Sequence, residues 1–504
     1  MNKNIKLFMA VVAGAASVTA QAKIEMGTPF SDGAVLQRGM KVPVWGKVVS
    51  SDGGDQTCDI VRVEFAGQEK CAAVGKDGAW KVEFDPMEAS SEGRTMTVRQ
   101  VAPGFIFDDV VDEVEVDDVL VGEVWFASGQ SNMECPIWGA TPRYRDGAGA
   151  LVTSMDHLPN VRFAKNDKAW SVKPTRAKSQ GWKKFEPSSF TGYTLSAVAY
   201  YYARELYLAL GGVPVGIVDA SWGGTNIDAW TPRCGYDGCD ASIRHVADWP
   251  VAEKWDASMK KGPISNGHQQ PTVLFNGMVD SWAPMAMRGF IWYQGCHNGG
   301  ESQLYAAKMR ALRDGWARRF ENPALKIYFV QLAPYTQNWP GLVAAQTSYA
   351  ESEPNAALAV TADVGNFDDI HPNRKEIVAK RLVVHALKRD YGFDIAEDDS
   401  PVLESAEFAN GAVTMKFRHA KGWYVYAPNR SIEPAFEVAG SDGVWKDAKL
   451  KNVEKNGIVK GESLVVAAES VPEPVKVRYL VRPRTMGTVF NQVSLPLGPF
   501  ESSK

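Results

Sequence analysis

Short apolar segments alternate with amphipathic segments from about residue 117 to 395, and this alternation constrains the fold more than any other feature. The apolar segments include "VLVGEVWFAS", "PVGIVDAS", "MRGFIWYQG" and "KIYFVQL". Between them, "SAVAYYYARELYLALG" and "ESQLYAAKMRALRDGWARRF" carry apolar residues at three- and four-residue spacing, which is typical of helices. Strands that alternate with helices predict a parallel sheet covered by helices on both faces. We therefore predict an α/β domain over residues 116–398.

The flanking regions have a different pattern. "KVPVWGKV", "DIVRVEFAG" and "GAWKVEFD" alternate apolar and polar residues and predict a β-sandwich-like domain over residues 23–115. The acidic stretch "DDVVDEVEVDD" at its end predicts a solvated edge or hairpin. "GAVTMKFRH", "ESLVVAA" and "VKVRYLVR" predict a second β-domain over residues 399–504. A chain of 504 residues is too long for one core, which agrees with several domains.

The first 22 residues have the layout of a secretory signal peptide. Lys3 and Lys6 precede an apolar stretch that ends at Ala20-Gln21-Ala22. That stretch is short for a membrane span. No cysteine lies near the cleavage site, so a lipid anchor is not expected. We predict export to the periplasm or the extracellular space, without a membrane anchor.

Charge and composition narrow the class of partner. The formal net charge is -4 and basic residues are not in excess, so nucleic acid is not an expected partner. Sixteen tryptophans offer aromatic faces that suit sugar rings, although tryptophan is also an ordinary core residue. No feature of the sequence indicates the oligomeric state.

Four polar or glycine-rich loops follow apolar strands in the α/β region. They are "GQSNM", "SWGGTNIDAW", "YQGCHNGG" and "NFDDIHPNRK". Because sites in open α/β sheets form at the carboxyl ends of the strands, we expect these loops to meet. Ser131 in the first loop is then a candidate nucleophile, while ordinary turn chemistry is the alternative.

A serine nucleophile needs a base and a carboxylate that orients it. Among the seven histidines, His371 stands in a strand-to-helix loop, three residues after Asp368. We predict His371 as the base and Asp368 as its orienter, with Asp369 and His297 as the rival orienter and rival base. His385 lies within a predicted helix and is expected to be structural.

An acyl-transfer site also needs donors for the developing oxyanion. The candidates are the Ser131 N–H, the backbone of Gly223 or Gly224 and the side-chain amide of Asn298. The neighbouring Gln130 and Gln294 are predicted to bind substrate. None of the cysteine spacings is a zinc pattern and no H-E-x-x-H motif occurs, so no metal site is predicted.

Together these blocks resemble the sialate O-acetylesterase family of the SGNH-hydrolase superfamily. "VGEVWFASGQSNME", "SWGGTNIDAW", "GFIWYQGCHN" and "DDIHP" occur in the family's order and spacing, and "AVLQRGMKVPVWG" and "FNQVSLPLGPF" extend the likeness to both ends. The resemblance implies a three-layer, flavodoxin-like α/β esterase domain between two all-β domains. It also implies hydrolysis of sugar acetyl esters without cofactor or metal. Ser131, His371 and Asp368 match the triad, and Gly223 or Gly224 and Asn298 match the oxyanion positions.

The chain departs from the family at two cysteines. Cys296 stands where the family usually has Glu, and Cys135 stands where it usually has an apolar residue. If the two loops meet at the site, Cys135 and Cys296 could form a disulfide that braces them. Two buried thiols are the alternative.

Three readings of the function remain open. An exported sialate O-acetylesterase is the leading one, since the residues that match the triad are intact. An esterase for acetylated xylan or another glycan would use the same chemistry. A carbohydrate-binding protein on an inactive esterase scaffold is the alternative of a different class.

Overall fold

The computed structural model describes residues 23–49, 59–102, 109–137, 158–186, 195–262, 264–337, 339–426 and 435–504. The predicted signal peptide, residues 1–22, and Cys58 lie outside these ranges. The chain forms two compact units. Residues 23–26, 45–82 and 96–115 belong to the first, whereas residues 27–44, 83–95 and 116–504 belong to the second.

The N-terminal region consists of strands, as its alternating sequence predicts. They are β1 (Lys23–Met26), β2 (Val35–Gln37), β3 (Val42–Val49), β4 (Ile60–Phe65), β5 (Gln68–Ala73), β6 (Ala79–Phe84), β7 (Ser90–Ala102) and β8 (Asp109–Gly129). The strands β1, β3 and β6 form a three-stranded sheet, and β4 pairs with β5 and β7. The acidic stretch pairs with the preceding strand, β7, and is mostly not buried, so the predicted solvated edge or hairpin is present. It is the first part of β8, a strand of 21 residues that continues into the α/β region.

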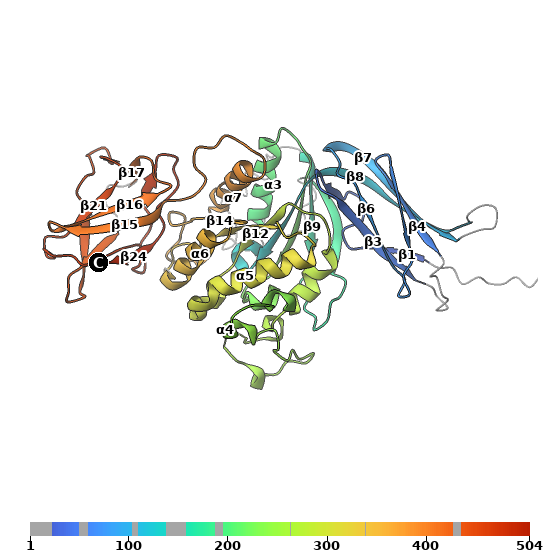
Figure 1. The fold of residues 1–504 in the computed structure, drawn as a ribbon, viewed down its shortest axis with the longest axis horizontal. Coiled ribbons are helices and arrows are strands. Elements are labelled where there is room, and N and C mark those ends of the chain that lie inside the picture. The colour runs from blue at the N-terminus through green and yellow to red at the C-terminus, as the bar shows by residue number, and fades with distance from the viewer. Residues whose placement is uncertain are drawn as a thin grey trace, which may run out of the picture. The chain divides into compact units, whose positions relative to one another are not determined.

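A mostly parallel sheet lies at the centre of the second unit (Figure 1). Its order is β10-β9-β11-β8-β12-β13-β14, and only β10 runs antiparallel to its neighbour. The strands are β9 (Leu158–Asn166), β10 (Ser179–Phe185), β11 (Val215–Ser221), β12 (Gly289–Tyr293), β13 (Lys326–Val330) and β14 (Ala356–Ala359). Every residue of β11 and β12 is buried, as continuous apolar strands between two helical layers require.

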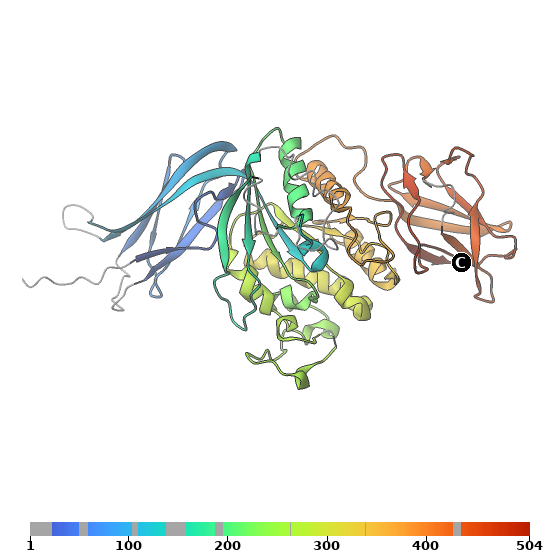
Figure 2. The ribbon, with the colours of Figure 1, turned by 180° about the vertical axis from the view of Figure 1, so that it is seen from behind.

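Helices cover both faces of this sheet. The helices are α1 (Ser131–Glu134), α3 (Ala197–Ala209), α4 (Ala241–Arg244), α5 (Ser302–Arg319), α6 (Pro340–Ser352) and α7 (Lys375–Arg389). The helices α3 and α7 pack together, and so do α5 and α6 (Figures 1 and 2).

Alternating side chains on the strands show that these helix pairs lie on opposite faces. In β8, Trp125 contacts Tyr202 of α3, whereas the next residue, Phe126, contacts Trp316 of α5. In β13, Tyr328 contacts α7 and the following residue contacts α6. Because successive strand residues point to opposite faces, the predicted layers of helix, sheet and helix are present.

The C-terminal region is again formed by strands. They are β15 (Val402–Ala409), β16 (Ala412–Arg418), β17 (Trp423–Val425), β18 (Phe436–Ala439), β19 (Trp445–Leu450), β20 (Ile458–Val459), β21 (Leu464–Ala467), β22 (Lys476–Tyr479), β23 (Val489–Asn491) and β24 (Phe500–Ser503). Seven of them pair in the order β15-β16-β21-β19-β18-β22-β24, and β20, β17 and β23 form a second sheet. Within the described residues, no helix is both long and apolar enough to span a membrane.

Candidate active site

Ser131 follows the strand at which the strand order of the sheet reverses. The central strand β8 has β11 and β9 on one side and β12, β13 and β14 on the other, so successive strands are added first toward one edge and then toward the other. Open α/β sheets place their ligands in the crevice at such a point. Gly129 ends β8 with φ +137°, and a Cβ there would lie 2.3 Å from the Tyr293 carbonyl oxygen. Only glycine fits this sharp exit, which places Ser131 as the first residue of α1.

Gln130 ties the first loop to the third. Its backbone N–H donates to the Tyr293 carbonyl (3.0 Å), and its Oε1 accepts from the N–H groups of Gly295 (3.1 Å) and His297 (3.3 Å). The residue is only 4% exposed. Its side chain therefore holds the two loops in register, and its Oε1 is not directed at a substrate.

The second loop brings Gly223 against Ser131. A Cβ on Gly223 would lie 3.2 Å from the Ser131 Cβ, so a side chain would crowd the nucleophile. The Gly223 N–H donates to Glu134 Oε2 (2.6 Å). Gly224 is exposed, and its carbonyl accepts from Gln269. Of the two predicted glycines, Gly223 is the one beside Ser131.

The third loop supplies a buried amide network. Asn298 is fully buried, and its Oδ1 accepts from the Ile227 N–H (3.0 Å) while its Nδ2 donates to Glu301 (3.0 Å). Gln294 is also fully buried: its Nε2 donates to Asn298 and to the Thr225 carbonyl. Its Oε1 accepts from a tyrosine hydroxyl (2.7 Å). Both ends of the Gln294 amide are thus bonded inside the protein, and the structure adds no support to the prediction that this residue binds substrate.

In the fourth loop, the carboxylate beside the His371 ring is that of Asp369, the predicted rival, and not that of Asp368. Asp369 Oδ1 accepts from the backbone N–H of His371 (2.9 Å) and lies 3.2 Å from its Nδ1. This is the local turn that an aspartate makes with the backbone two residues ahead. Asp368 points away: its side chain is 83% exposed and pairs with Arg484 (3.2 Å). The structure thus favours Asp369, the rival orienter, over Asp368.

Asn132, the residue after Ser131, joins the first loop to the fourth. Its Nδ2 donates to the carbonyl of Ile370 (3.0 Å), which directly precedes His371. Its Oδ1 accepts from Lys375, a fully buried lysine at the start of α7. Sequence reasoning missed both residues. The adjacency of Asn132 to Ser131 was the only available signal, and nothing marked Lys375 as buried.

Basic and aromatic side chains line the surroundings of Ser131. Lys168 pairs with Glu134, and its Nζ lies 5.7 Å from the ring centre of Trp222. Trp222 stacks on His268 with ring centres 4.6 Å apart and planes 6° apart. Burial, with the nearby His297 and Lys168, lowers the pKa of His268. This group was not predicted from the sequence, although Trp222 directly precedes Gly223.

Cys135 and Cys296 are thiols in the structure, as are the other described cysteines. The disulfide considered from the sequence is not formed, and the alternative of two thiols is the one present. Burial raises the pKa of Cys296 to about 12. Burial, together with the nearby Cys296 and Cys135, raises the pKa of Tyr293.

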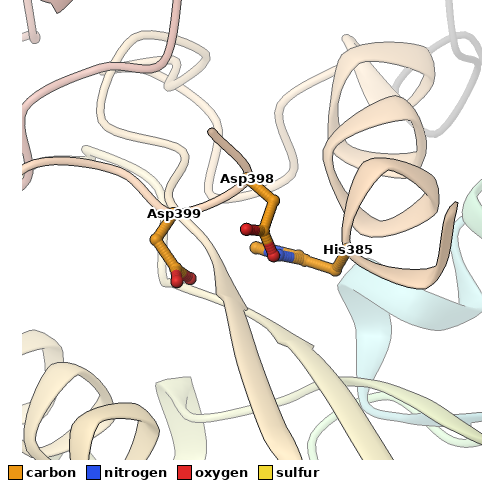
Figure 3. A group of neighbouring side chains, drawn as sticks. All are labelled: His385, Asp398 and Asp399. Carbon is orange, nitrogen blue, oxygen red and sulfur yellow. The ribbon is translucent and has the colours of Figure 1, made fainter. Parts of the chain in front are cut away.

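Among the residues that the structure describes, two groups of acidic and histidine side chains have the spacing of metal ligands, and both lie near the end of α7. His385, Asp398 and Asp399 form the first group (Figure 3). His385 Nδ1 lies 3.1 Å from Asp398, and Arg389 donates to both Asp398 and Asp399 (2.6 Å each). Burial opposes ionisation of Asp398, but hydrogen bonds from His385 and Lys388 lower its pKa overall. The two cations, Lys388 and Arg389, pair with the two carboxylates, so this cluster is an ion-pair network. His385 is structural, as predicted.

Comparisons with known proteins all point to one family. The profile of the family described as "Carbohydrate esterase, sialic acid-specific acetylesterase" matches residues 121–383. Sialate O-acetylesterase from Rattus norvegicus is 28% identical over 69% of this chain and 70% of its own length. The human enzyme is 26% identical over 72% and 70%. A crystal structure of a carbohydrate acetylesterase from Xanthomonas citri superposes with a TM-score of 0.76 and 28% identity, covering 95% of this chain and all of its own.

Proposed function

Because this chain belongs to the sialic acid-specific acetylesterase family of carbohydrate esterases, and is thus a carboxylic ester hydrolase, we propose that Ser131 is its nucleophile and His371 its base. The observation that carries the assignment is the convergence of four loops on Ser131. Gln130, Gly223 and Asn132 hold it against the third, second and fourth loops. Residues 116–398 then form an SGNH-type esterase domain between two β-domains.

The orienting carboxylate is Asp369 in this proposal. Its contact with Nδ1 fixes the imidazole so that Nε2 can take the proton of the Ser131 hydroxyl. The negative charge of Asp369 also stabilises the imidazolium that forms. Asp368 keeps the loop attached to Arg484 and takes no part in proton transfer.

The oxyanion is held by the N–H groups of Ser131 and Gly223 and by the amide of Asn298. Gly223 supports this role because its backbone lies beside the Ser131 side chain. In the free protein its N–H is bonded to Glu134, so the carbonyl oxygen of the substrate must replace that carboxylate. One of the two Asn298 Nδ2 hydrogens is used by Glu301, which leaves the second for the oxyanion.

Hydrolysis then proceeds in two halves. Ser131 Oγ attacks the acetyl carbonyl while His371 takes its proton, and the tetrahedral intermediate collapses as His371 protonates the departing sugar hydroxyl. The acetyl group is now an ester of Ser131. Water gives a proton to His371 and attacks this ester, and release of acetate restores the serine.

The substrate proposed is O-acetylated sialic acid. Lys168 beside the second loop supports a sugar that carries a carboxylate, because its ammonium group can provide positive charge near the nucleophile. Acetylated xylan remains the second candidate, since the proposed triad would act on it in the same way. Residues 1–22 are proposed to export the protein.

The test is acetate release from O-acetylated sialic acid and acetylated xylo-oligosaccharides in parallel. Wild type should release acetate from the first, and Ser131→Ala should lose activity by several orders of magnitude. Ser128→Ala is the matched control, because Ser128 is the buried serine in the strand before the loop. Release from the xylo-oligosaccharides alone would move the substrate to plant glycans, and full activity of Ser131→Ala would refute the nucleophile.

A further inference from the structure

The side chain of Asn132 holds the fourth loop on both sides of His371. Its Nδ2 donates to the carbonyl of Ile370 (3.0 Å), the residue just before His371. Its Oδ1 accepts from the ammonium group of Lys375, four residues after His371. Asn132 is only 3% exposed. One buried amide thus holds both ends of the short segment that carries the proposed base.

The same amide is fixed to the proposed nucleophile. Asn132 directly follows Ser131 in α1, a single helical turn whose N–H groups donate to the Gln130 carbonyl (2.8 and 2.9 Å). Because a planar peptide bond joins Ser131 to Asn132 within this turn, the amide cannot move far without moving Ser131. The two hydrogen bonds of the amide therefore connect the position of His371 to that of Ser131.

Lys375 determines which way this amide faces. An ammonium group can only donate, so the Asn132 oxygen faces Lys375 and the NH2 group is directed at the Ile370 carbonyl. An aspartate in place of Asn132 could accept from Lys375 but could not donate to Ile370, and a leucine could do neither. Among side chains of this size, asparagine alone serves both partners.

The placement of Lys375 is costly, which argues against a purely stabilising role. The residue is fully buried and is the first residue of α7, where the helix dipole disfavours a cation. Its Nζ also lies 5.1 Å from the centre of the Tyr293 ring, at the end of β12. Buried ionic groups can often be replaced by apolar residues of similar size without loss of stability. The position of the fourth loop therefore explains this lysine better than the stability of the fold does.

We propose that Asn132 and Lys375 are positioning residues, and that together they form a clamp that holds the His371 imidazole within reach of the Ser131 hydroxyl. The clamp rests on the proposed function, in which Ser131 and His371 are nucleophile and base. A displacement of about 1 Å can cost about 10²-fold in rate. Loss of either half of the clamp should therefore lower kcat and leave KM nearly unchanged, since neither residue contacts the substrate in this proposal.

The experiment is a double-mutant cycle on the full chain, with p-nitrophenyl acetate as substrate. Lys375→Met removes the ammonium group but keeps a side chain of similar length, and Asn132→Ala removes the amide. Each should lower kcat by about 10²-fold, with KM within about threefold of the wild-type value. Because both act through one contact, the double variant should also lose about 10²-fold, whereas independent losses would multiply to about 10⁴-fold.

Lys388→Met is the matched control, because it makes the same change in the same helix. Lys388 pairs with Asp398 (2.9 Å) near the other end of α7, about 20 Å from Lys375 along the helix axis. It should keep the wild-type kcat. Thermal unfolding followed by circular dichroism should place Lys375→Met within about 4 °C of wild type. If Lys375→Met does not fold, Asn132→Asp replaces it in the test, because it keeps the acceptor for Lys375, loses only the donor to Ile370 and should lower kcat by about 10²-fold.

The outcomes separate the clamp from the esterase assignment. A folded Lys375→Met or Asn132→Ala that keeps the wild-type kcat, while Ser131→Ala is inactive, would overturn the clamp and leave the assignment intact. Losses that multiply in the double variant, or a rise in KM with unchanged kcat, would also overturn it. Full activity of Ser131→Ala would instead refute the proposed function on which the clamp rests.

Discussion

Replacing Asp369 and Asp368 one at a time by Asn gives the sharpest test of the proposed proton transfer. The carboxylate of Asp369 lies 3.2 Å from His371 Nδ1, and the two side chains are 19% and 9% exposed. At this distance an imidazolium and a carboxylate interact by about 2.5–5 kcal/mol for an effective dielectric constant of about 20–40. Since each 1.36 kcal/mol is tenfold in rate, Asp369→Asn should lower kcat by roughly 10² to 10⁴.

Asp368→Asn is the matched control, because it makes the same change at the adjacent aspartate. Its side chain is 83% exposed and its ion pair with the half-exposed Arg484 is a surface interaction, worth about 1 kcal/mol at most. We expect a loss of less than about fivefold. Acetate release is measured as kcat and KM for both variants, with circular dichroism to show that they fold. A large loss in Asp368→Asn with near-normal Asp369→Asn would refute this account of the fourth loop.

Three further predictions concern the oxyanion, the ion-pair network and the Cys296 thiol. Asn298→Ala should lower kcat by ~10²–10³ with little change in KM, and unchanged kcat would remove it from the oxyanion site. Asp398→Asn should lower the free energy of unfolding by about 3 kcal/mol at pH 7. Because the folded pKa of Asp398 is depressed, this difference should shrink as the pH falls below about 4, and a pH-independent difference in urea titrations would contradict it. Cys296, with a pKa of about 12, should resist iodoacetamide at pH 8 until the protein is denatured; labelling in the native state, detected by peptide mass spectrometry, would show that it is accessible.

The sheet and the position of Ser131 could be predicted because both depend on local pattern. Buried strands between two helical layers must be almost wholly apolar, and β11 and β12 are. The polar loop after each strand then had to lie at one edge of the sheet. The acidic part of β8 was correctly predicted as a solvated edge or hairpin, but the pattern gave no sign that the same strand continues into the parallel sheet.

The details of the candidate site depend on contacts between distant residues, which the sequence pattern does not contain. Asp368 and Asp369 are adjacent carboxylates, and the choice between them depends on the turn at His371 and on Arg484, 116 residues away. Gln294 has the residue type of a substrate ligand, but its amide is used by partners inside the protein. The roles of Asn132 and Lys375 depend on packing between two distant loops, which local pattern does not encode.

The measurement that tests the central claim most directly is covalent labelling of the nucleophile. The purified protein is treated with a fluorophosphonate, digested and analysed by mass spectrometry, with acetate release followed on the same samples. The account predicts one label, on the peptide that contains Ser131, with activity lost in proportion to labelling and no label in Ser131→Ala. Labelling of another serine in step with the loss of activity, or an active enzyme whose Ser131 is fully labelled, would contradict it.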